Sequence, residues 1–138
     1  MAIFEWTPKF VTGNREIDFQ HQNLFNLANA LILTNALYRT LNKPEMRLVV
    51  EILLAQLKKD AEDHFLDEEK LMRESRYEEI SQHLAMHDTL RGQLASFQRK
   101  FKGGEVTLSE DMTKFLEEWF LSHILHADNK LCSFLNNR

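Results

Sequence analysis

Seven side chains that can bind metal ions lie at helical spacing in this sequence, on stretches that otherwise carry apolar residues. The seven are His21, His64, Glu68, His83, His87, His123 and Asp128. Imidazoles and carboxylates are costly to bury unless a partner compensates for the lost hydration, and a metal ion is such a partner. So large a set on inward-facing positions therefore predicts a metal site inside a bundle of helices.

The number and type of these ligands limit the metal. Histidine and carboxylate without thiolate suit iron, zinc, copper or manganese, and a nitrogen-rich set favours iron over manganese or magnesium. Because zinc closes with four protein ligands, or three and a water, seven ligands imply two ions that share carboxylates. His123 and Asp128 are five residues apart, about 140° around an α-helix, so we expect them to serve different sides of the site, as a bridging carboxylate would.

Four amphipathic helices must position these ligands, because apolar residues recur every three or four positions rather than every two. We expect helices at approximately 18–41, 44–73 and 78–102 and a fourth from about 107, after an irregular N-terminal arm. Short joints between long helices favour an all-α, up-down-up-down antiparallel four-helix bundle.

The joints between the helices carry the expected stop and start signals. Pro44 suits the first turn of the second helix, where its missing N–H has no intrahelical partner. Gly103 and Gly104 offer a left-handed stop for the third helix. Thr107 with Glu110 resembles a capping box that opens the fourth.

The face of each helix that we expect to be buried mixes apolar residues with ligands. The first face is His21, Leu24, Ala28 and Leu31, and the second is Val50, Leu54, Leu57, Ala61, His64, Glu68 and Leu71. The third is Ile80, His83, His87, Leu90, Leu94, Phe97 and Phe101, and the fourth is Leu116, Phe120, His123, Ala127 and Leu131, with Asp128 beside it.

Length and composition narrow the class of protein further. A chain of 138 residues has the length of one ordinary domain, so we expect residues 1–138 to form a single domain. The net charge of −4, with both signs interspersed, argues against nucleic acid or a membrane surface as partner. Cys132 is the only cysteine, and neither a signal peptide nor a membrane span is apparent, so we expect a cytoplasmic protein.

These residues resemble the hemerythrin family closely, in particular bacterial hemerythrins and hemerythrin-like domains. The resemblance covers nearly the whole chain. It includes Trp6, Gly13, the segment from Ile17 to His21, the run from His64 to Glu69, the pair His83 and His87, Trp119, His123 with Ile124, and Asp128.

The resemblance implies a non-haem di-iron site that cycles between Fe2+ and Fe3+. One iron would be held by three histidines and the other by two, with Glu68, Asp128 and an oxo or hydroxo group as bridges. The three-histidine ligands would be His83, His87 and His123, and the two-histidine ligands His21 and His64. The two-histidine iron would keep one open position, at which dioxygen binds reversibly.

The resemblance also implies an apolar pocket around that open position, formed by Leu24, Phe65, Trp119 and Ile124. Apolar walls would exclude the water and protons that are needed to displace bound peroxide from the iron. Ala127 at a fifth pocket position is small, so we expect readier access for water or small anions.

Several functions remain open at this stage. The first is storage or delivery of dioxygen, and the second is sensing of dioxygen or redox state as the input domain of a longer protein with an output domain. A di-iron enzyme that reduces peroxide, nitric oxide or dioxygen is the alternative, and a metal-free bundle for partner binding is the simplest one. We expect His126 to lie beside the ligands or face solvent, and Cys132 to be a small buried residue.

Overall fold

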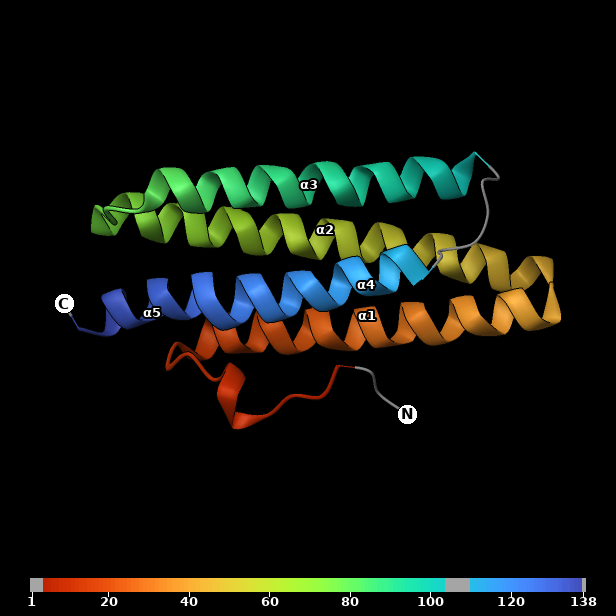
Figure 1. Cartoon of the computed structure of the whole chain (residues 1–138), viewed down its shortest axis with the longest axis horizontal. Coiled ribbons are helices and arrows are strands. Elements are labelled where there is room, and N and C mark those ends of the chain that lie inside the picture. Colours follow the sequence, from red (N-terminus) through yellow and green to blue (C-terminus); the bar gives the residue numbers. More distant parts are fainter. Residues whose placement is uncertain (1–3, 104–109, 138) are drawn as a thin grey trace.

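The computed structural model describes residues 4–103 and 110–137, and every regular element in this part is helical. The elements are η1 (Pro8–Phe10), α1 (Arg15–Leu41), α2 (Pro44–Ser75), α3 (Ile80–Lys102), α4 (Glu110–Glu118), η2 (Trp119–Asp128) and α5 (Asn129–Asn136). Figure 1 shows that α1, α2, α3 and the continuous run of α4, η2 and α5 form long columns, each running opposite to the one before it. The predicted antiparallel four-helix bundle is therefore confirmed.

The ends of α1 and α2 follow local signals in the sequence. The Asn14 side chain accepts a hydrogen bond from the backbone N–H of Ile17 at 3.1 Å, so α1 begins at Arg15, earlier than predicted. Asn42 ends α1 in a left-handed conformation with φ of 50°, and Pro44 opens α2 as expected. Arg76 ends α2 in the same way, with φ of 58°.

The predicted signals around the loop from α3 to α4 fare differently. Gly103 follows α3 with φ of −75°, so the left-handed stop predicted there is wrong for Gly103. Gly104 and the capping residue Thr107 lie outside the described residues. Ile80 begins α3 two positions later than predicted, because Tyr77 and its neighbours form a turn after α2.

The middle of the fourth column is not α-helical. From Trp119 to Asp128 the chain forms a π-helix, in which each backbone N–H bonds five residues back instead of four. The wider turn brings residues five apart nearer to the same face. This change of period, which apolar spacing does not reveal, falls on the segment that carries His123 and Asp128.

The interior of the bundle contains an apolar half and a ligand half, with a small second apolar cluster beyond the ligands. The apolar half is filled by Ala28, Leu31, Val50, Leu54, Leu57, Leu94, Phe101 and Leu116. The ligand half contains the seven predicted metal ligands, all buried. Beyond them, Met72, Tyr77 and Leu131 form a small second apolar cluster. The polar side chains are thus enclosed between two apolar layers.

Most residues predicted to face inward are buried, but a few lie only half inside. The half-buried ones are Leu71, Ile80, Phe97 and Ala127. Met72 is fully buried in place of Leu71, since the step inward after Glu68 is four residues and not three. The side chain of Phe120 lies outside the described part of the structure.

The N-terminal arm is fastened to the bundle rather than loose against it. The backbone N–H and C=O of Phe4 both bond the Asn29 side chain at 2.8 Å, and Phe4 and Phe10 pack in the apolar core. Gly13 has φ of +90°, and the Asn136 side chain beside it donates to the carbonyl of Thr12 at 3.1 Å. Among the described helices, none has the length and apolar character that a membrane span needs.

Candidate metal centre

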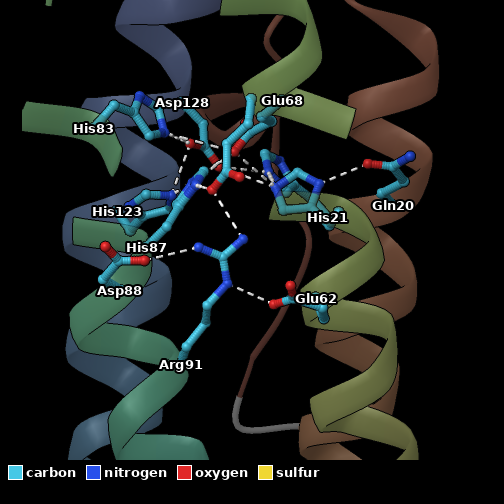
Figure 2. A network of polar contacts seen from close by, with 12 residues as sticks. Gln20, His21, Glu62, Glu68, His83, His87, Asp88, Arg91, His123 and Asp128 are labelled. Atoms are coloured by element: carbon cyan, nitrogen blue, oxygen red, sulfur yellow. Dashed lines mark hydrogen bonds and ion pairs between the residues drawn. The ribbon is translucent and has the colours of Figure 1, made fainter. Parts of the chain in front are cut away.

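All seven predicted ligands meet in one buried place inside the ligand half, and six of them are labelled in Figure 2. His21 and the pair His64 and Glu68 come from facing positions on α1 and α2. His83 and His87, four residues apart on α3, present their rings on one face. His123 and Asp128 come from η2. Each of the seven is at most 3% exposed.

Two groups of ligand atoms share two carboxylates. Glu68 and Asp128 join His83, His87 and His123 in one group, and the same two residues join His21 and His64 in the other. Within each group the ligand atoms all lie within 4.8 Å of one another. Two carboxylates common to a three-histidine and a two-histidine group are the arrangement that two neighbouring cations require.

All five imidazoles direct Nε2 toward the carboxylates. Nε2 of His21 lies 2.8 Å from Oδ2 of Asp128, and Nε2 of His87 lies 3.1 Å from Oε1 of Glu68. Nε2 of His123 lies 2.9 Å from Oδ1 of Asp128. Because a single oxygen set faces five nitrogens, the site is arranged around a common centre and not as separate ion pairs.

The π-helix explains the position of Asp128. On an α-helix His123 and Asp128 would be about 140° apart, yet their ligand atoms are in contact at 2.9 Å. The expectation that they serve different sides is therefore wrong, because the i to i+5 period of η2 aligns them. Asp128 nevertheless lies between the two histidine groups, in the position expected of a bridge.

Proton equilibria in the metal-free site reflect the crowding of opposite charges. Burial alone lowers the pKa of His64, but attraction to Glu68 and hydrogen bonds with Asp128 and Glu68 outweigh it and raise the pKa to about 10. For His83 burial likewise opposes, while Asp128 and Glu68 raise its pKa to about 9. The histidines in turn hold the pKa values of Glu68 and Asp128 well below the usual range, despite burial.

Hydrogen bonds outside the site fix the tautomer of two ligands. The Nδ1–H of His64 donates to Oε1 of Gln20 at 2.6 Å, and the Nδ1–H of His87 donates to Oε2 of Glu69 at 2.8 Å. With the proton held on Nδ1, the lone pair of a neutral ring lies on Nε2 and points inward. This is the tautomer that a metal ligand needs.

The residues present fit a metal by a further observation. Oε2 of Glu68, Oδ1 of Asp128 and Nε2 of both His83 and His123 are buried without a hydrogen bond of acceptable geometry. Nε2 of His21 and of His64 approach within 3.2 Å, an arrangement that is unfavourable unless a proton or a cation lies between them. Buried atoms of this kind cost about 1–3 kcal/mol each when unsatisfied, and metal ligation would satisfy them together.

The apolar side chains predicted to form a pocket differ in how deeply they are buried. Leu24, Phe65, Trp119 and Ile124 are at most 3% exposed and belong to one apolar cluster. Phe65 stacks on the ring of His87, with centroids 4.3 Å apart. Ala127 is half-buried and lines a surface depression of about 270 Å³ that also contacts His83. Its place beside the other four stays a prediction.

His126 and Cys132 have the exposure predicted from the sequence. His126 is exposed and lines the same surface depression as Ala127. Cys132 is fully buried, and burial raises the pKa of its thiol to about 12. A thiol with such a pKa is not a reactive nucleophile at neutral pH.

Sequence reasoning missed the side chains that surround the ligands. Gln20, Glu69 and Arg91 all contact a ligand directly or through one intermediate. Arg91 follows His87 by four residues, a spacing that could have indicated a neighbour on the same face. Glu69 gives no such signal, since its contact with His87 depends on how α2 and α3 dock.

Fold and site together define an all-helical bundle with a candidate histidine and carboxylate metal centre. Residues 12–135 match the family described as "Hemerythrin HHE cation binding domain". The chain belongs to the hemerythrin family.

Individual relatives agree with this assignment. The chain is 33% identical over 129 residues to a bacteriohemerythrin of Methylococcus capsulatus, with 93% of each chain covered. It is 29% identical over 127 residues to a myohemerythrin of Theromyzon tessulatum, covering 92% of this chain and 89% of that one. A crystal structure of wild-type hemerythrin superposes with a TM-score of 0.82 at 30% identity, covering 97% of this chain and 98% of that one.

Proposed function

We propose that the chain forms a single domain, residues 1–138, which holds two iron ions. His83, His87 and His123 would hold one iron, and His21 and His64 the other. Glu68 and Asp128 would bridge the two. The observation that carries this proposal is the pair of buried ligand groups that share these two carboxylates.

From this site we infer reversible binding of dioxygen. Hemerythrins are oxygen-binding non-haem iron proteins, and an iron pair in such a site supplies the electrons with which dioxygen is held and the means to release it. The five imidazoles keep Nε2 turned inward, and the two carboxylates balance the charge of the cations. The role that we assign to the protein is therefore storage or delivery of dioxygen.

The apolar side chains beside the ligands support binding over turnover. Leu24, Phe65, Trp119 and Ile124 carry no group that titrates at neutral pH, and their burial excludes water from the adjoining interior. An enzyme that reduces peroxide, nitric oxide or dioxygen needs protons delivered to the reacting atoms. We infer that these four side chains protect bound dioxygen from proton transfer.

Iron quantitation combined with optical spectra tests the proposal. Purified protein reconstituted under anaerobic conditions should contain two irons per chain and change its spectrum on exposure to air. Removal of oxygen should reverse the change, with one equivalent of dioxygen recovered. A single metal ion per chain would overturn the di-iron proposal, and continuous oxygen uptake with excess reductant would replace the carrier with an enzyme.

A further inference from the structure

Glu69 lies directly after the ligand Glu68 but is not itself among the candidate ligands. Its side chain is 7% exposed. Oε2 of Glu69 accepts a hydrogen bond from Nδ1–H of His87 at 2.8 Å and another from Nη2 of Arg91 at 2.9 Å. Glu69 thus pairs with Arg91 through the same oxygen that contacts His87. His87 therefore has a fixed negative charge against its outer nitrogen.

Arg91 is anchored on several sides, as Figure 2 shows. Beyond Glu69, its guanidinium donates to Glu62 and, at 3.0 Å, to Asp88. The guanidinium also lies over the ring of Phe65, 5.3 Å from the centroid. Phe65 stacks in turn on His87. Arg91 thus reaches the His87 ring along two routes, one through a carboxylate and one through an aromatic ring.

The other histidine with an outer hydrogen bond differs in charge. The Nδ1–H of His64 donates to the amide oxygen of Gln20, and Gln20 donates to Asp67 at 2.7 Å. Within the described residues, Nδ1 of His21 and of His123 are buried without a hydrogen-bond partner. Among these four rings, His87 alone donates from its outer nitrogen, Nδ1, to a carboxylate. A carboxylate draws the Nδ1 proton more strongly than an amide does, which makes Nε2 the better electron donor.

We propose that Glu69 and Arg91 are positioning residues that act through His87 and set the reduction potential of the metal pair. The inference rests on the proposed di-iron function. Glu69 makes His87 electron-rich and so favours the oxidised metal, whereas Arg91 draws charge from Glu69 and limits that effect. The two residues therefore act in opposite directions on one ligand.

The midpoint potential of the iron-loaded protein, measured by spectroelectrochemical titration, tests this opposition. Glu69→Gln should shift the potential upward and weaken iron retention by about 10–100-fold. Arg91→Gln should shift it downward, and Arg91→Lys should return it part of the way toward the original value. Shifts of Glu69→Gln and Arg91→Gln in the same direction, or no shift in either, would overturn the proposal.

Glu62→Gln is the matched control, because Glu62 contacts Arg91 but makes no contact with His87. Removal of this charge should move the potential much less than Glu69→Gln. An equal movement would mean a general field effect and would overturn the role of His87. Circular dichroism of each variant confirms that the bundle is intact.

A measurement on protein loaded with a redox-inactive metal tests the inference separately from the proposed function. In zinc-loaded protein, the Nδ1–H resonance of His87 should lie far downfield and move upfield in Glu69→Gln. A resonance unchanged by Glu69→Gln would overturn the inference even with two irons bound. Failure of the protein to load two metal ions would instead count against the proposed function.

Discussion

The apolar half and the ligand half of this bundle are built on the same helices and the same seam positions. In the apolar half the inward positions hold residues such as Leu31, Leu54 and Leu94, which are at most 1% exposed. In the ligand half the equivalent positions hold histidines and carboxylates that are buried as deeply. Burial therefore lowers the free energy of the apolar half and raises that of the ligand half, because transfer out of water is favourable for apolar groups and unfavourable for charged ones.

The two halves contribute differently to the stability of the fold and to metal binding. The apolar half stabilises the fold through burial, since each fully buried leucine contributes about 1.5–3 kcal/mol. The ligand half depends on compensation between imidazoles and carboxylates, and it leaves several buried atoms unsatisfied without a cation. Substitutions in the two halves should therefore separate stability from metal binding.

Removal of a shared carboxylate should have the largest effect. Glu68→Gln takes a negative charge from both ligand groups and leaves Asp128 as the one carboxylate that the two groups share. We expect a loss of about 3–5 kcal/mol in unfolding free energy and less than two irons per chain. Asp88→Asn, at a carboxylate that is 76% exposed, is the control. Full iron content in Glu68→Gln would contradict the role of the shared carboxylate.

A cavity in the apolar half should cost nearly as much stability without loss of metal. Leu54 is 1% exposed, and Leu54→Ala should lower the unfolding free energy by about 2–5 kcal/mol in urea titrations. The iron content of the folded protein should stay at two per chain. Iron lost in proportion to stability would show that the two halves are not separable.

Removal of the metal should make stability depend on pH through the ligand half. The pKa values of His64 and His83 are raised to about 10 and about 9 in the metal-free fold. Groups with a raised pKa stabilise the fold fully below the unfolded value of about 6.5, and this stabilisation is lost as pH rises through 9 to 10.

We expect the unfolding free energy of the metal-free protein to fall by on the order of 1–2 kcal/mol as the pH rises through 9 to 10. Metal-loaded protein should not follow it, because the metal replaces the protons. Urea unfolding of both forms between about pH 6 and pH 10 measures the difference. A metal-free form whose stability is constant or rises over this range would be inconsistent with the protonated histidines.

The smallest effect is expected at the edge of the ligand half. Ala127 lines the surface depression that also contacts His83. Ala127→Ile should fill part of that depression and slow autoxidation of the oxygenated protein, because water reaches the ligand less readily. Ala36→Ile, at an exposed position on α1, is the matched control. Equal autoxidation rates in Ala127→Ile and the unsubstituted protein would exclude this route for water.

Much of the fold could be predicted because each seam repeats at three or four residues. This period correctly predicted, without knowledge of tertiary contacts, that His64 and Glu68 lie on the buried face of α2. It made the same correct prediction for His83 and His87 on α3. The same reasoning failed at Asp128, because the spacing of apolar residues does not distinguish a π-helix from an α-helix. A rule based on one helical period can find a ligand and still misjudge its direction.

The surroundings of the site were harder to predict for a different reason. Glu69 and Gln20 stand one position before or after a ligand, where an isolated helix would point them aside. Their contacts with His87 and His64 arise only from the docking of neighbouring helices. Information of that kind lies in pairs of helices and not in any one segment.

The distance along the chain between the ligands has a consequence for biosynthesis. His21 and Asp128 meet at 2.8 Å although 107 positions separate them in sequence. A chain still emerging from the ribosome lacks His123 and the shared carboxylate of Asp128 until the last helix has been made and docked. The full ligand set therefore exists only after the helix that carries Asp128 has docked against α1, so a loaded centre marks a bundle whose four columns are in place.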